Sequence, residues 1–193
     1  MAKPLPLNER LNTVTQIIIR ARVFFDIWWF YEGKETRPII KSTWESYDQF
    51  CIFDGHANLI AYVVQITSVF DRNRRTMSLA RIIEELESSK EIPAEALPEL
   101  KSCLKEAEGI CDRVKKLRHN LFAHRSASRA YSEVFKDARL TANELRTLSD
   151  ISLRIANRLL AIRDLPEQFF NECPRKDLQK MFERLGKPSA EKT

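Results

Sequence analysis

Glycine and proline are scarce in this sequence, whose 193 residues contain only four glycines and eight prolines. A chain with many tight turns needs more of both, so a β-sandwich, a propeller and a glycine-rich dinucleotide-binding fold are disfavoured. Hydrophobic residues make up 44% of the sequence, which is enough for a sizeable core without disulfides or metal ions. We therefore predict an all-α protein, a single-domain helical bundle of about five to six helices.

Cysteine and histidine are also few. The four cysteines have neither Cys-x-x-Cys spacing nor the density of a disulfide scaffold, so reduced and mostly buried thiols are expected. The three histidines, His56, His119 and His124, form no His-Glu-x-x-His motif and no Cys/His quartet with zinc spacing. The sequence also lacks a Walker loop, a Gly-x-Gly-x-x-Gly motif and a Gly-x-Ser-x-Gly elbow. No metal and no cofactor are expected.

Long apolar runs are absent as well. The most apolar stretches, residues 14–31 and 50–70, are interrupted by charged or polar residues, and a membrane span needs about 20 apolar ones. The first ten residues contain no apolar stretch followed by a small-residue cleavage site, so no secretory signal is visible. We expect a cytoplasmic protein without membrane association.

Apolar residues recur at steps of three and four in several segments, which is typical of amphipathic helices. The predicted helices cover residues 8–31, 42–70, 79–89, 98–123 and 141–163, with a short one after Pro174. The segment 42–70 is predicted as one helix or as two joined near Asp54-Gly55, and residues 125–139 as a loop with at most one helical turn. The domain covers residues 1–193, with a core over about 8–165 and a short helix and tail over 166–193.

Three local patterns define ends and faces of these helices. Ser78 is placed to cap the helix over 79–89, and Thr141 and Glu144 have the spacing of a capping box. The end of the first helix is heavily aromatic between Phe24 and Tyr31. Core packing is the favoured role of these rings, with a subunit interface as the alternative.

Positive charge is concentrated in one short stretch. The net charge is +5, and residues 111–130 contain six basic groups and one acidic group. Within this stretch, a basic segment runs from Lys115 to Arg125 at the end of the predicted helix 98–123. Arg118 lies beside the apolar stripe of that helix, so it must pair with a carboxylate or open onto a solvent cleft where an anion can sit. A second basic cluster, Arg72, Arg74 and Arg75, is interpreted as a solvated turn, with the extension of an anion-binding groove as the alternative.

The basic segment resembles the HEPN superfamily, whose signature is an arginine followed by four to six residues and a histidine. Here Arg118 and His124 are separated by five residues, and Arg113 and His119 fit the same spacing. The run Val69-Phe70-Asp71 and the helix start Thr76-Met77-Ser78-Leu79 resemble the abortive-infection AbiU-type branch. That branch commonly has an acidic residue after the arginine, so His119 is a departure from its pattern.

The resemblance implies a helical bundle that forms a homodimer, in which two Arg/His motifs face one cleft, and metal-independent cleavage of RNA. His124 would be the acid and base of that reaction, and Arg118 would bind the phosphate. His119 and Asn120 are further catalytic candidates, as orienting groups. The candidates for electrostatic attraction to RNA are Lys115, Lys116, Arg125 and Arg129.

Two further implications concern the biological setting. The resemblance implies a toxin or phage-defence role, with an antitoxin or a nucleotidyltransferase as a further partner. The alternative is a non-catalytic helical module that binds RNA or protein, in which Arg118 pairs with a carboxylate across the dimer. An assay for RNA cleavage in EDTA distinguishes the two.

Overall fold

The computed structural model describes residues 5–73, 77–122 and 131–186. In this part of the chain all regular structure is helical, which confirms the predicted all-α class. The helices are α1 (Leu7–Glu32), α2 (Arg37–Ser46), α3 (Asp48–Ser68), α4 (Leu79–Ser88), α5 (Leu97–Phe122), α6 (Tyr131–Ala138), α7 (Ala142–Ile162) and α8 (Cys173–Leu185). The described residues thus form eight helices, more than the five to six predicted.

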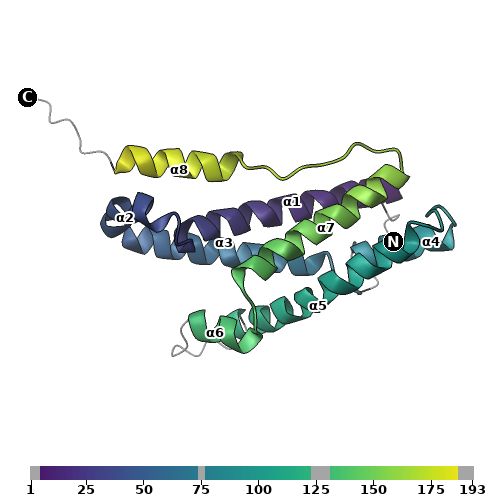
Figure 1. The fold of residues 1–193 in the computed structure, drawn as a ribbon, viewed down its shortest axis with the longest axis horizontal. Helices are drawn as coiled ribbons and strands as arrows, with labels where there is room; N and C mark the ends of the chain where they lie inside the picture. The colour runs from purple at the N-terminus through teal and green to yellow at the C-terminus, as the bar shows by residue number, and fades with distance from the viewer. Residues whose placement is uncertain (1–4, 74–76, 123–130, 187–193) are drawn as a thin grey trace, which may run out of the picture.

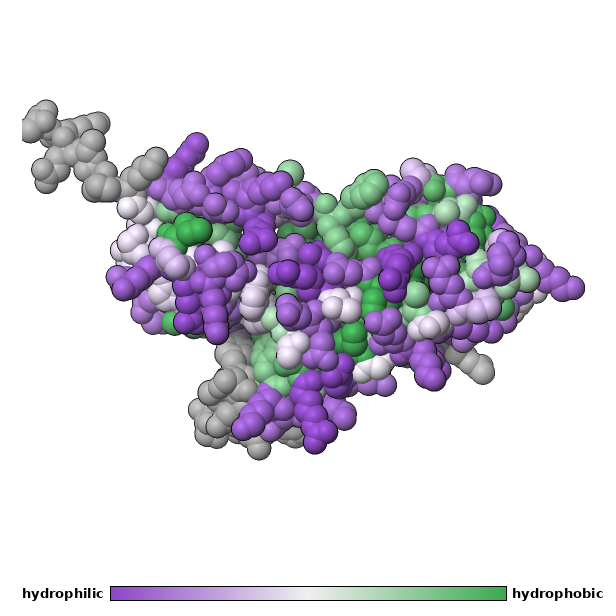
Figure 2. Space-filling view, in the orientation of Figure 1, coloured by the Kyte–Doolittle hydropathy of each residue, from purple (hydrophilic) through white to green (hydrophobic). Residues whose placement is uncertain are grey.

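The long helices pack lengthwise on one another (Figure 1). Helix α1 makes its most extensive contact with α3 and the next with α7, while α5 packs against α7 and α3. The side chains between them form one large core, in which Val14, Phe25, Tyr62, Val114 and Leu159 are fully buried. The face drawn in Figure 2 is mostly hydrophilic, and apolar residues show through it in a central band. The bundle therefore holds α5, whose C-terminal end is basic, against α3 and α7.

The aromatic end of α1 packs into the core, as favoured from the sequence. Phe25, Trp28, Phe30 and Tyr31 are all buried. The ring centroid of Phe25 lies 5.7 Å from that of Trp28 and 5.5 Å from that of Tyr62 on α3. These separations are within the range of favourable ring pairs. The rings thus join α1 to α3.

Two predicted boundaries are wrong. The chain breaks at Tyr47, between α2 and α3, and not near Asp54-Gly55. The N–H of Tyr47 makes the last hydrogen bond of α2, to the carbonyl of Thr43, but its own φ of −132° and ψ of 37° are not helical. Gly55 lies inside α3 and is buried beside Tyr31 of α1, where a Cβ would be 3.4 Å from the ring, an ordinary van der Waals contact. Local sequence rules interpret a glycine as a break, whereas this one continues the helix.

The second wrong boundary is the loop predicted over residues 125–139, because residues 131–138 form α6. Its partly buried Phe135 stacks on Trp28 of α1, with ring centroids 5.8 Å apart and planes 3° from parallel. A helix of eight residues is too short to be stable by itself in water, so this tertiary contact supports it. The short terminal helix predicted after Pro174 is present as α8.

Helix α8 closes a second, smaller core. Phe182 packs edge-on against Phe30 and near Tyr31, and Ile40 and Cys51 complete the cluster. The hydroxyl of Thr43 also donates to the carbonyl of Phe182 at 3.2 Å. An extended segment that starts after α7 leads to α8 along the outside of the bundle (Figure 1). The C-terminal region is therefore anchored on α1 and α2.

All four cysteines are free thiols. Cys51 and Cys111 are buried, Cys103 is partly buried and Cys173 is exposed. Burial raises the pKa of Cys111 to about 12 and also raises the pKa of Cys51. Within the described residues no helix combines the length and apolarity that crossing a bilayer requires.

The capping box predicted for α7 is present, and Thr141→Ala should test its contribution. The Thr141 hydroxyl accepts from the Glu144 N–H at 3.2 Å, and the Thr141 N–H donates to the Glu144 carboxylate at 2.9 Å. Loss of the cap is expected to lower the free energy of unfolding by about 1 kcal/mol, measured by urea titration.

Ser78→Ala is the matched control for this cap. Ser78 occupies the N-cap of α4, as predicted, but its side chain makes no capping bond and its buried hydroxyl has no partner in the described structure. Its removal is expected to leave stability unchanged or slightly raised. Equal losses in the two variants would show that the capping hydrogen bonds are not the cause.

Candidate functional site

The basic side chains lie on the last two turns of α5, where the helix is fixed by its buried face. Val114 and Leu117 are fully buried, so the residues between and after them point outward. The exposed basic residues are Lys115, Lys116, Arg118 and His119. The buried apolar stripe of α5 thus determines which of its basic side chains are exposed to solvent.

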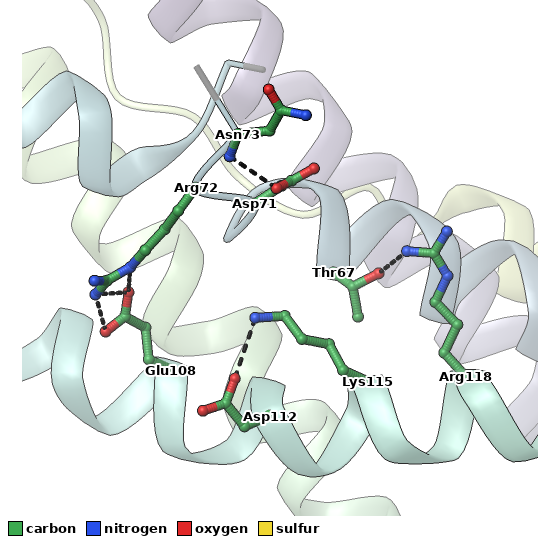
Figure 3. A network of polar contacts seen from close by, with 8 residues as sticks. All are labelled: Thr67, Asp71, Arg72, Asn73, Glu108, Asp112, Lys115 and Arg118. Carbon is green, nitrogen blue, oxygen red and sulfur yellow. Dashed lines mark hydrogen bonds and ion pairs between the residues drawn. The ribbon is translucent and has the colours of Figure 1, made fainter. Parts of the chain in front are cut away.

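Arg118 extends from α5 toward the C-terminal part of α3 (Figure 3). Its Nη1 donates to Oγ1 of Thr67 at 3.4 Å, a long and weak hydrogen bond. Thr67 can accept because its own hydroxyl proton is directed to the carbonyl of Val63, 2.7 Å away. Since a guanidinium has five N–H donors, most of them are left without an acceptor among the described residues.

The surroundings of Arg118 bear on the two alternatives predicted for it, a carboxylate partner or an opening to solvent. No described carboxylate forms an ion pair with it, and its side chain is exposed. Thr67 lies on a helix 51 residues earlier in the chain, and no sequence pattern indicated it as a neighbour. The hydroxyl orients the guanidinium without neutralising it, so an anion can bind there.

Arg113, the arginine of the other match to the signature, has a different environment. Its Nη1 lies 2.7 Å from Oε1 of Glu144 on α7 and donates to the carbonyl of Arg139 at 3.1 Å. The hydrogen bonds from Thr141 and Arg113 hold the pKa of Glu144 below its usual range, although burial opposes this. Arg113 therefore joins α5 to α7, and Arg118 is the better anion-binding candidate.

A shallow depression of about 370 Å³ lies between the end of α5 and α6. It is lined by Lys115, Lys116 and His119 of α5 and by Asp137 of α6. Lys115 also contacts Asp112, with Nζ and Oδ1 3.1 Å apart (Figure 3). Three basic side chains thus gather at one place, and the two carboxylates beside them reduce the local positive charge.

The second basic cluster contributes less free charge than its composition suggests. Arg72 donates to both carboxylate oxygens of Glu108, at 2.7 and 2.9 Å (Figure 3). These bonds raise the pKa of Arg72. Arg74 and Arg75 lie outside the described residues. The structure therefore adds no described cation from this turn to the site.

Several predicted site residues lie outside what the structure describes. His124, Arg125 and Arg129 are in this group, and Asn120 is described only as part of the α5 backbone. Their roles remain predictions. Across the described ranges, no group of three or more His, Cys, Asp or Glu side chains is arranged to hold a metal ion.

The described chain is an all-helical bundle with an exposed arginine near the end of its long fifth helix. The chain belongs to the HEPN superfamily. Within it, the family model of AbiU2 matches residues 6–162, which span α1 to α7. Comparisons with curated proteins and with solved structures found no match.

Proposed function

We propose that this protein is a metal-independent endoribonuclease with a toxin or phage-defence role. The observation that supports this best is the environment of Arg118, an exposed guanidinium held by one hydroxyl and without a described carboxylate partner. Membership of the AbiU2 family supports the same proposal, since its match includes the complete Arg118 to His124 motif. The partner of the site is RNA.

The chemistry requires only groups that this chain has. A base removes the proton of the RNA 2′-OH, the 2′ oxygen attacks the adjacent phosphorus, and the bond from phosphorus to the 5′ oxygen breaks. An acid gives the departing 5′ oxygen its proton, and the products are a 2′,3′-cyclic phosphate and a 5′-OH. A histidine imidazole ordinarily has a pKa of about 6.5, so His124 is suited to act as base and as acid.

Arg118 supplies the charge stabilisation. Its planar fork matches two phosphate oxygens, and the negative charge on them grows as the 2′ oxygen attacks. His119 and Asn120 are proposed to orient the phosphate or the imidazole. The four remaining basic candidates, Lys115, Lys116, Arg125 and Arg129, attract the RNA backbone. A homodimer supplies two such sets.

The decisive assay compares RNA with DNA of the same sequence in the presence of EDTA. The RNA is expected to be cut and to carry 2′,3′-cyclic phosphate ends, and the DNA is expected to stay intact because it lacks the 2′-OH nucleophile. Loss of cleavage in EDTA, or cleavage of the DNA, would contradict the mechanism. If RNA is bound with a steep salt dependence but never cut, the protein is a binding module instead.

A further inference from the structure

The depression between the end of α5 and α6 combines hydrogen-bond donors with a carboxylate acceptor. Lys115, Lys116 and His119 border it from α5, and Asp137 borders it from α6. All four residues are exposed. Its volume of about 370 Å³ is near the lower end of the usual range for ligand sites, roughly 300 to 1,000 Å³. A site of this size suits one small planar group and not a helix of a partner protein.

The packing of α6 fixes the backbone that carries Asp137. Two residues earlier, Phe135 stacks on a tryptophan of α1. The next residue, Ala138, is buried, and the carbonyl of Arg139 accepts a hydrogen bond from Arg113 of α5 at 3.1 Å. The exposed carboxylate thus stands on a segment that is held on both sides. A group positioned in this way by its neighbours can discriminate between ligands.

Lys116 is the matching donor in the depression. It has no carboxylate partner among the described residues, whereas Nζ of Lys115 lies 3.1 Å from Oδ1 of Asp112. An ammonium group has three N–H donors and no acceptor, and an ionised carboxylate has two oxygens that only accept. Lys116 and Asp137 together therefore suit a group that has one acceptor beside two donors.

We propose that this depression binds a guanine base of the RNA and that Asp137 selects it. On its Watson–Crick edge, guanine has two adjacent N–H donors, at N1 and N2, and the acceptor O6 beside them. Asp137 accepts from both donors, and Lys116 donates to O6. This inference rests on the proposed function, because it names the base that the RNA presents beside the site.

The other three bases match this pair of side chains less well. Adenine and cytosine have one amino donor next to an acceptor nitrogen, so that nitrogen would face a carboxylate oxygen. Uracil has one N–H donor between two carbonyl acceptors, with the same result. Two acceptors that face each other make no hydrogen bond, and both lose the water that solvated them. Among the four bases, guanine alone supplies a donor to each carboxylate oxygen.

The depression lies within one helical turn of the phosphate-binding candidate. Lys115 and Arg118 are three residues apart on α5, so their Cβ atoms are about 5 to 6 Å apart. Arg118 extends toward Thr67 of α3 (Figure 3), and Asp137 lies on the α6 side of α5. RNA that crosses the end of α5 can thus place a phosphate at Arg118 and a base at Asp137. Guanine is therefore expected next to the nucleotide that is cut.

The test measures binding of the full chain to short RNA that it cannot cut. Oligouridines with 2′-O-methyl groups, which block the nucleophile, carry one guanine, adenine or cytosine or are left unchanged. In fluorescence anisotropy, the guanine oligomer is expected to bind roughly 5- to 150-fold more tightly than the others. Inosine lacks the N2 amino group of guanine, so in its place it should lose most of that preference.

Asp137→Asn is the matched variant of the protein, because it keeps the shape of the side chain but replaces one acceptor with a donor. It is expected to bind all the oligomers about equally. Its affinity for the unchanged oligouridine should be equal to the wild-type value or higher, since a negative charge near the RNA is removed. Asp112→Asn removes an exposed carboxylate that does not border the depression, and it should keep the guanine preference.

Three results would overturn the proposal. The first is equal binding of the guanine oligomer and the others by the wild type, and the second is equal binding of inosine and guanine. The third is an Asp137→Asn protein that keeps the guanine preference while its affinity for every oligomer rises, because the carboxylate then acts through its charge alone.

Cleavage of unmodified RNA by the wild type is scored separately, so that the two proposals can fail independently. A guanine preference in a protein that never cuts RNA supports the base site and rejects the nuclease. Cleavage at positions unrelated to guanine, together with equal binding of the oligomers, supports the nuclease and rejects the base site.

Discussion

Alanine at Arg118 or at His124 is expected to lower the rate of RNA cleavage by about 10²- to 10⁴-fold. Arg118 stabilises the negative charge that develops on the phosphate, and His124 transfers the proton. Binding of RNA should weaken far less, since Lys115 and Lys116 remain. Arg118→Lys should recover only part of the lost rate, because an ammonium group cannot contact two phosphate oxygens in one plane. Single-turnover cleavage of a labelled RNA measures each rate.

Two control variants test whether the effects are specific to Arg118 and His124. Each removes an arginine or a histidine that lies outside the motif. Arg72→Ala removes an exposed arginine that is already paired with Glu108, and His56→Ala removes the histidine outside the motif. Both should cut RNA at nearly the wild-type rate. Wild-type cleavage by the Arg118→Ala and His124→Ala proteins would end the proposed mechanism, and full rescue by Arg118→Lys would show that only the charge matters.

The fold was predictable where the chain contains long periodic segments. The segment predicted over 98–123 corresponds to α5 at Leu97–Phe122, and that over 141–163 to α7 at Ala142–Ile162. Each spans at least five turns, so the apolar period is unambiguous. The short helix α6 was missed because a tertiary contact supports it, the stacking of Phe135 on Trp28. The break at Tyr47 was missed as well.

The candidate site was predictable only in part. Helical periodicity places Arg118 beside Val114 and Leu117, but it cannot say that Thr67 comes within 3.4 Å from another helix. It also could not separate Arg118 from Arg113, which differ in the structure by the carboxylate of Glu144. Contacts between side chains of different helices depend on how the bundle packs. The spacing of residues in a single sequence does not predict them.

Helix α3 shows the same limit in another way. Apolar residues recur throughout the segment 42–70, and an amphipathic helix usually has one apolar face. The structure divides them between a buried face with Tyr62 and Ile66 and an exposed face with Phe53 and Val64. Only the position of α1 and α5 reveals which face is covered. The sequence shows that this segment has many apolar residues. It does not show which of them are buried and which are exposed.

Phe25→Ala is expected to destabilise the fold by about 3 to 5 kcal/mol, since it leaves a cavity at the centre of the core. The ring is fully buried and packs against Trp28 and Tyr62. Tyr62 in turn donates its hydroxyl to the carbonyl of Leu145 at 2.6 Å, so the cavity opens beside a contact that holds α3 to α7. In a domain of this size the melting temperature should fall by about 10 °C.

Phe169→Ala removes the same side chain from a site where it is 72% exposed, and it should change the melting temperature by little. Thermal unfolding followed by circular dichroism compares the two variants at one protein concentration, since dimerisation would also raise stability. A small change for Phe25→Ala would mean that the core relaxes to fill the space. In that case the aromatic rings at the end of α1 do not fix the position of α3. Thr67 on α3, and the guanidinium of Arg118 that contacts it, would then depend on other packing contacts.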